Sequence, residues 1–142
     1  MRSLSQTEIF RATYLYDEVI SHFMWDAGVL LISLSLIFIA IKIPYVSLSS
    51  SNLLLIFLGA AFFGFTFTVN GIEGQTVLMT FPGAIFGSCL SFILYIKGKK
   101  EGLNNPFHLF FAVAYLIAAI LFAYWGIVYR SFPEFSELGW IH

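Results

Sequence analysis

Charged residues are scarce in this sequence. Asp, Glu, Lys and Arg make up 11 % of the 142 residues, whereas 59 % of the residues are hydrophobic. A soluble domain of this length could not cover so large an apolar core, since about half of an ordinary soluble composition is apolar. The composition therefore excludes a soluble globular domain and indicates an integral membrane protein.

The sequence also lacks residues that disulfide formation, ion pumping and haem binding would require. Cys89 is the one cysteine, which excludes a disulfide within the chain, and we interpret it as a small core residue. No Asp or Glu lies inside the longest apolar runs, which argues against an ion pump acting alone. A haem held between His22 and His108 is excluded because they lie at opposite ends of predicted spans. We expect no cofactor and no metal.

Four apolar runs take up most of the chain. A helix of about 20 apolar residues matches the roughly 30 Å hydrocarbon core of a bilayer. Lys42, at the end of the first run, is the only charged residue inside them. The sequence therefore predicts an all-α fold, a single transmembrane domain over residues 1–142, with a bundle of four transmembrane helices at residues 27–43, 53–69, 77–96 and 107–128.

The segment before the first span has its own helical pattern. One apolar stripe is formed by residues that recur every three or four positions, Ile9, Ala12, Tyr16, Ile20 and Phe23. A helix of this kind either lies on the membrane surface or leads straight into the first span. We predict an N-terminal amphipathic interfacial helix. Further along, Asn70 and Gly71 are expected to end the second span, and Asn105 and Pro106 to begin the fourth.

The distribution of charge predicts the orientation. Four spans place both termini on one side, together with the loop at 70–76. The opposite side carries all four lysines and one acidic residue, whereas the side of the termini carries three arginines and seven acidic residues. Because Lys and Arg gather on the cytoplasmic side of membrane proteins, we predict that both termini lie on the non-cytoplasmic side.

Small residues recur on the third and fourth runs at spacings that suit close helix packing. Without a hydrophobic drive between helices in lipid, small residues let two backbones approach. The predicted packing residues are Gly83, Gly87 and Ser91 on the third run and Ala119, Ala123 and Gly126 on the fourth. They pack either within this chain or against other membrane protein chains.

A polar cluster is predicted at the outer face. Glu18, His22 and Asp26 are spaced four residues apart and share one side of a continuous helix, and Glu73 ends the second span. Two carboxylates and an imidazole could hold a divalent cation, or act as acid and base on an exposed phosphate or ester. The alternative is that these groups form only the wet face of an interfacial helix.

Part of this pattern resembles the VanZ-like family of small bacterial membrane proteins. The matching segments are Glu18-Val-Ile-Ser-His22-Phe23, then Glu73-Gly-Gln75, then the Gly-Ala-x-x-Gly opening of residues 83–87, and they cover residues 17 to 90. The family's Asp-Lys pair is Glu18-Val19 here, and its Arg and Asp before the third span are absent. The resemblance implies a role in the cell envelope.

Two function classes follow from these features. The first is a non-catalytic accessory or assembly subunit, or a lipid-contacting scaffold, whose partners are the lipid bilayer and other membrane protein chains. The alternative is a small membrane enzyme or ligand-binding protein that uses the four outer-face groups. A nucleic acid partner is excluded because the only basic patch is the lysine loop at 97–100, which indicates topology and contact with anionic lipid.

Overall fold

In the computed structural model, the regular secondary structure of the described residues is helical. The structure describes residues 8–98, 102–135 and 137–140. The first helix runs through α1 (Glu8–Tyr14), a π-helical turn (Leu15–Ile20) and α2 (Ser21–Ile39) to a 3-10 turn (Ala40–Lys42). It is followed by α3 (Ser50–Glu73), α4 (Val77–Gly98) and α5 (Pro106–Tyr129).

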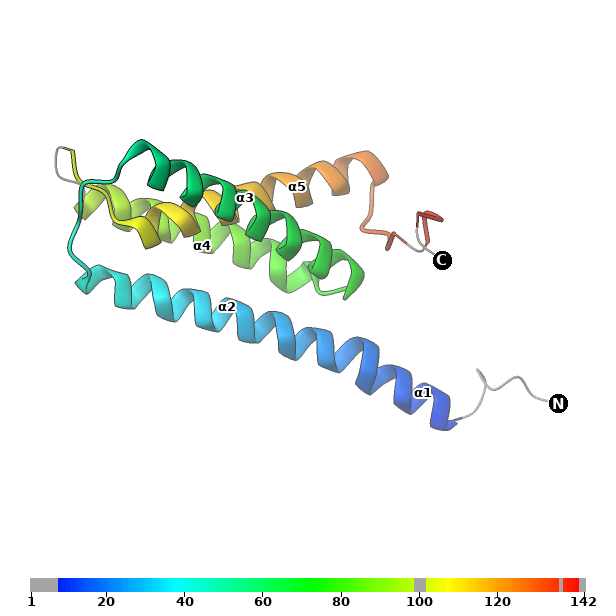
Figure 1. The fold of residues 1–142 in the computed structure, drawn as a ribbon. Helices are drawn as coiled ribbons and strands as arrows, with labels where there is room; N and C mark the ends of the chain where they lie inside the picture. The colour runs from blue at the N-terminus through cyan, green and yellow to red at the C-terminus, as the bar shows by residue number, and fades with distance from the viewer. Residues whose placement is uncertain (1–7, 99–101, 136, 141–142) are drawn as a thin grey trace.

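Within the described residues, four helical stretches are long and apolar enough to cross a membrane. They are Glu8–Lys42, Ser50–Glu73, Val77–Gly98 and Pro106–Tyr129. The predicted all-α class and the four long apolar helices are confirmed. The turn between α3 and α4 lies at the same end as α1 and the segment after α5, and we call this the turn end (Figure 1). The other end, where residues 43–49 and 102–105 connect the helices, is the loop end.

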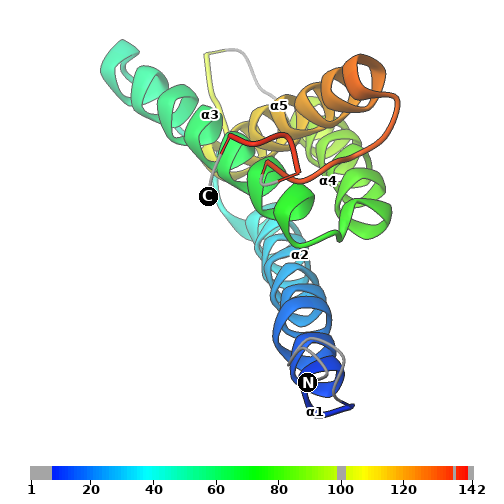
Figure 2. The same cartoon turned by 90° about the vertical axis from the view of Figure 1, so that its right-hand side faces the viewer.

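A separate interfacial helix before the first span is not present among the described residues. From Glu8 to Ala27 the sequence contains no proline and no glycine, so nothing interrupts the helix before the first span. The predicted apolar stripe therefore continues into α2 instead of forming its own element. α1 and the start of α2 project away from the other three helices (Figure 2), and Ile9, Tyr16 and Phe23 on this stripe are exposed.

Helix α5 is the centre of the bundle, and its most extensive contacts are with α3 and α4. Its buried residues are Phe111, Ala112, Ala114, Tyr115, Ala118, Phe122 and Trp125, together with His108 near its start. Asn105 caps this helix by accepting from the backbone N–H groups of Phe107 and His108, and Pro106 is the first helical residue, as the sequence predicts.

Glycines set the closest approaches of the helices. A Cβ added at Gly64 would lie 2.3 Å from the carbonyl oxygen of Ala114, and one at Gly87 would lie 2.8 Å from the ring of Tyr115. Gly64 thus brings α3 against α5, and Gly87 brings α4 against α5. A Cβ at Gly83 would meet Leu30 of α2.

The remaining predicted packing residues differ in their surroundings. Ser91 is fully buried. A Cβ at Gly126 would meet the ring of Phe132, which follows α5, while Ala119 and Ala123 are half-buried.

The loop end fastens α2 to the start of α5. The side chain of Asn105 donates to the carbonyl oxygen of Ala40 at 2.9 Å, and Nε2 of His108 lies 3.0 Å from the carbonyl oxygen of Ile37. Since a carbonyl can only accept, Nε2 carries the proton. Nearby, Val46 and Asn104 form an antiparallel bridge that joins the two connections.

Gly64→Ala and Gly59→Ala, both on α3, should have opposite effects on stability. The new methyl group at Gly64 would collide with backbone, so we expect a loss of about 1–3 kcal/mol. At Gly59 the nearest atom is 3.5 Å away, an ordinary contact, and the gain in helix propensity is roughly 0.5–1 kcal/mol. Thermal unfolding of both variants in one detergent measures this. Equal midpoints would show that α3 and α5 are not held as closely as described.

Candidate functional site

The α3–α4 turn reverses the chain within three residues. Helix α3 continues past Asn70 and Gly71, which were predicted to end it, and stops at Glu73. Gly71 is required inside the helix because a Cβ there would lie 2.6 Å from the hydroxyl of Thr80. The turn closes when the backbone N–H of Gly74 donates to Asn70 and that of Thr76 donates to Gly71. This tight geometry presents the side chains of Asn70 and Thr76 to α2.

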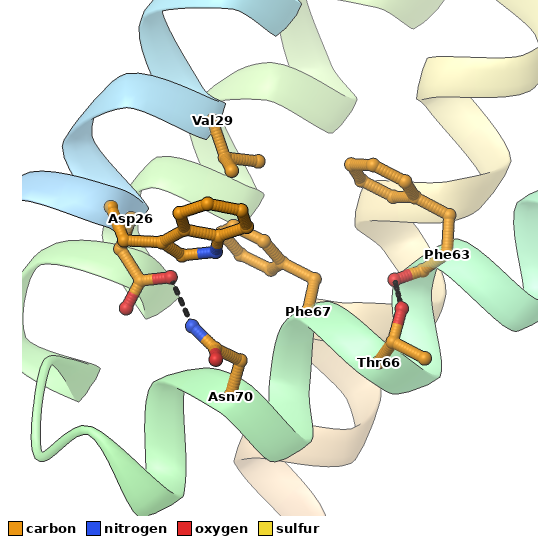
Figure 3. Close-up of a pocket in the computed structure, with 7 residues that line it drawn as sticks. Asp26, Val29, Phe63, Thr66, Phe67 and Asn70 are labelled. Carbon is orange, nitrogen blue, oxygen red and sulfur yellow. Dashed lines mark hydrogen bonds between the residues drawn. The ribbon is translucent and has the colours of Figure 1, made fainter. Parts of the chain in front are cut away.

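Asp26 of α2 accepts hydrogen bonds from the side chains of Asn70 and Thr76. Its side chain is 1 % exposed. The amide of Asn70 donates to Oδ1 at 2.6 Å, and the hydroxyl of Thr76 donates to Oδ2. Figure 3 shows the carboxylate and the Asn70 amide pointing toward each other from α2 and α3. Asp26 therefore joins α2 to α3 and to the turn, and each of its two oxygens accepts a hydrogen bond.

His22 lies one helical turn before Asp26 and faces the same α3–α4 turn. A Cβ added at Gly74 would lie 2.8 Å from Nδ1 of His22, so the ring packs directly over this glycine. The ring is half-buried. His22 and Asp26 thus share one side of α2, as their spacing predicts, and both contact the 70–76 segment.

Glu73 takes part in a different contact. Its carboxylate accepts from the backbone N–H of Phe135 at 2.6 Å, and Gln75 donates to Glu134. The indole of Trp125 donates to the carbonyl oxygen of Pro133 at 3.1 Å. These bonds fold the segment after α5 back over the turn end. Glu73 therefore holds the C-terminal segment, and it is not among the hydrogen-bond partners of Asp26.

The four predicted outer-face groups are thus only partly brought together. His22 and Asp26 meet at the turn, Glu73 bonds to the C-terminal segment, and the side chain of Glu18 lies outside the described part of the structure. Among the residues described, no set of three His, Cys, Asp or Glu side chains is placed to hold a metal ion.

A cavity of about 280 Å³ opens beside Asp26, between α2 and α3. We call it the polar cavity. Asp26 and Asn70 form its polar end. Its other walls are Trp25 and Val29 of α2 and Phe63, Thr66 and Phe67 of α3. In Figure 3, Val29 and Phe67 extend into the space between the two helices. A neighbouring hollow at His22 shares Trp25 and Asn70 with this cavity.

A second cavity of about 370 Å³ lies toward the loop end. We call it the apolar cavity. It is formed entirely by apolar side chains, Leu36 of α2, Ile56 of α3, and Pro106, Phe107, Phe110 and Phe111 of α5. Phe63 of the polar cavity contacts Phe110 and Phe111, with ring centroids 5.7 and 6.3 Å away. Both cavities have walls on α2 and α3, and the apolar cavity is also lined by α5; together we call them the α2–α3 groove.

Comparisons of this chain with protein-family models, with curated proteins and with solved structures found no match. The chemistry of the site is therefore argued from its geometry.

The sequence singles out Asp26 and His22 as candidates, but not the residues that they contact. Asn70 was interpreted as a helix terminator, and Thr76 was not singled out. The sequence does carry one signal, because both are hydrogen-bonding residues at the border of an apolar span, where a polar residue needs a partner.

Asn70→Ala should lower stability, whereas Thr66→Ala on the same helix should not. The first variant leaves one buried carboxylate oxygen without its donor, which costs about 1–3 kcal/mol. Thr66 is exposed and bonds to the carbonyl oxygens of Phe62 and Phe63 in its own helix, so its loss should stay within about 0.5 kcal/mol. Denaturant unfolding in detergent compares them. Similar values for the two variants would contradict the role given to Asn70.

Proposed function

We propose that this multi-span membrane protein is a lipid-contacting scaffold that holds one lipid chain in the α2–α3 groove. The observation that carries the proposal is the composition of the groove, apolar at one end and polar at the other. Lipid is the surrounding solvent of the long apolar helices, and a groove between two of them that side chains do not fill is a place for a hydrocarbon chain.

The groove is longer than the hydrocarbon layer of one leaflet. From Ile56 to Asn70 is fourteen residues along α3, or about 21 Å at 1.5 Å per residue. One leaflet of a bilayer holds roughly half of the 30 Å hydrocarbon thickness. A chain with its head group near Asn70 therefore fills the polar cavity within its own leaflet and reaches the apolar cavity only by extending past the middle of the bilayer.

The depth of the polar end supports the same assignment. Asn70 lies within one turn of the end of α3 at Glu73, so the polar cavity sits where a span meets the head groups. Trp25, which lines this cavity, belongs to a residue type enriched at that depth. The head group would then lie among polar atoms while the tail lies among apolar side chains.

The position of α2 explains why the groove exists. Ser33 and Ile37 on α2 are buried, and α2 packs mainly against α4 and α5, with little contact to α3. Polar contacts fix α2 at both ends, through Asp26 at the turn end and through Ile37 and Ala40 at the loop end. Between these two attachments α2 and α3 leave space.

The proposal includes no catalysis. Asp26 is engaged by Asn70 and Thr76, and Glu73 is engaged by the backbone of Phe135. An acid–base mechanism needs two groups that reach the same substrate, and Glu73 bonds to the C-terminal segment and not to Asp26. The enzyme alternative would require Glu18, His22, Asp26 and Glu73 to act together. The resemblance to VanZ-like proteins remains a hypothesis about the cellular setting.

The orientation is part of the proposal. Lys42 and Lys97 lie at the loop end and are exposed, and Lys99 and Lys100 follow them in the sequence. We propose that the loop end faces the cytoplasm and that the turn end, with the polar cavity, faces the opposite side.

Ile56→Trp should displace the bound lipid. Ile56 lines the apolar cavity, and an indole there would occupy part of its 370 Å³. Leu54→Trp on the same helix is the matched control, because Leu54 is 59 % exposed and is not part of the groove. Lipid retained by each purified variant is counted by native mass spectrometry, with loss expected in Ile56→Trp alone.

Two results would oppose this function. Equal lipid retention in both variants would show that the groove does not hold the chain. A stoichiometric protein that co-purifies with the wild type and is released by Ile56→Trp would instead identify the groove as the seat of a partner helix, in favour of an accessory subunit.

Cysteine labelling tests the orientation. Cys89→Ser gives a cysteine-free chain, to which a single cysteine is added at Ser47 in the loop-end connection or at Ser131 after α5; both positions are exposed. A membrane-impermeant thiol reagent added outside intact cells should label position 131 and not position 47. The reverse pattern would mean that the side with the three arginines, and not the side with the four lysines, faces the cytoplasm.

A further inference from the structure

We propose that the polar cavity selects a single-chain amphiphile with a positively charged amine as its head group. This inference rests on the proposed function, because the chain of the same amphiphile would lie in the rest of the α2–α3 groove. It adds the chemical class of the head group, which the groove alone does not specify.

The first argument is the charge of Asp26. The carboxylate is buried, and its hydrogen-bond partners among the described residues are an amide and a hydroxyl, both neutral. A buried charge is costly unless an opposite charge accompanies it. Each carboxylate oxygen has two lone pairs and accepts one bond from these partners, so it can accept another. An ammonium group in the polar cavity would supply both the missing charge and the missing donors.

The second argument is the aromatic wall. Trp25 lines the polar cavity and the neighbouring hollow at His22, and Phe63 and Phe67 line the opposite side. The faces of aromatic rings attract cations, and indole does so most strongly. A carboxylate together with aromatic rings therefore recognises an amine better than it recognises a neutral hydroxyl, which gains a hydrogen bond only.

The surroundings also disfavour an anionic head. Glu73 and Glu134 line a further hollow at the same end of the bundle, and among the described residues no lysine or arginine lines the polar cavity. A phosphate or carboxylate head placed beside Asp26 would meet like charge without a compensating cation. The polar cavity therefore favours a cation by attraction and rejects an anion by repulsion.

The test compares three amphiphiles with the same sixteen-carbon chain, namely hexadecylammonium, hexadecanol and hexadecyl phosphate. Binding of radiolabelled forms to the full-length protein is measured at one fixed detergent concentration, with uptake by protein-free micelles subtracted. We expect the ammonium form to bind about tenfold more tightly than the alcohol, and the phosphate to bind least.

Variants assign the preference to the polar cavity. Asp26→Asn should reduce the preference for ammonium over alcohol to near unity, whereas Asp17→Asn, the same change at an exposed position of the same helix, should leave it intact. Trp25→Leu is the second variant, because Trp25 is 67 % exposed and its loss should leave the fold unchanged. It should weaken binding of the ammonium form more than that of the alcohol, which decides the question if Asp26→Asn does not fold.

Each further outcome separates this inference from the function on which it rests. If the ammonium form and the alcohol bind equally to the wild type, and Ile56→Trp weakens both, the head-group inference is overturned while chain binding stands. If Asp17→Asn abolishes the preference as fully as Asp26→Asn, general surface charge explains it and the inference is again overturned. If no amphiphile binds and Ile56→Trp changes nothing, both proposals fail.

Discussion

Hydrogen bonds at two ends of α2 determine how this helix bundle is assembled. In a bilayer the hydrophobic effect does not drive helices together, so association depends on close packing and on polar contacts. Helices α3, α4 and α5 use close packing, with glycines at the points of nearest approach. Helix α2 has no comparable approach to α3. At the turn end it is held instead by the hydrogen bonds that Asp26 accepts from Asn70 and Thr76. The buried carboxylate is what fixes α2 there.

A helix attached at its ends has a different environment along its length from one that is packed throughout. The two attachments of α2 are separated by the stretch from Asp26 to Ile37, and α2 as a whole packs against α4 and α5 more than against α3. The groove left beside α3 changes from carboxylate and amide to phenylalanine and isoleucine along its course. This order follows the polarity of a lipid molecule from head to tail, and it arises directly from where the attachments lie.

The sequence was sufficient to predict the helices, because run length and the scarcity of charge are local properties. It was also sufficient to place His22 and Asp26 on one side of a helix. It could not show which side faces the bundle, since that depends on Asn70 and Thr76, 44 and 50 residues away. The interpretation of the outer-face groups as a wet face is therefore wrong for Asp26, which is buried.

The ends of elements were harder to predict for a related reason. Asn70 and Gly71 are common at helix ends, and local preference alone favours a stop there. In the structure both have tertiary partners, Asp26 for Asn70 and Thr80 for Gly71, and the helix continues for one more turn. The separate N-terminal helix was expected from an amphipathic stripe, but a stripe does not end a helix when no residue breaks it.

The length of the first helix has a consequence for membranes of different thickness. Its 35 residues extend about 52 Å, whereas α3 to α5 have 22 to 24 residues each. Even at a tilt of about 40°, the upper end of the observed range, such a helix exceeds the roughly 30 Å of hydrocarbon. One end of it must leave the apolar layer, and α1, which projects from the turn end, is that end (Figure 2). A thinner or thicker bilayer would then change how many residues of α1 are immersed, while the three packed helices keep their depth.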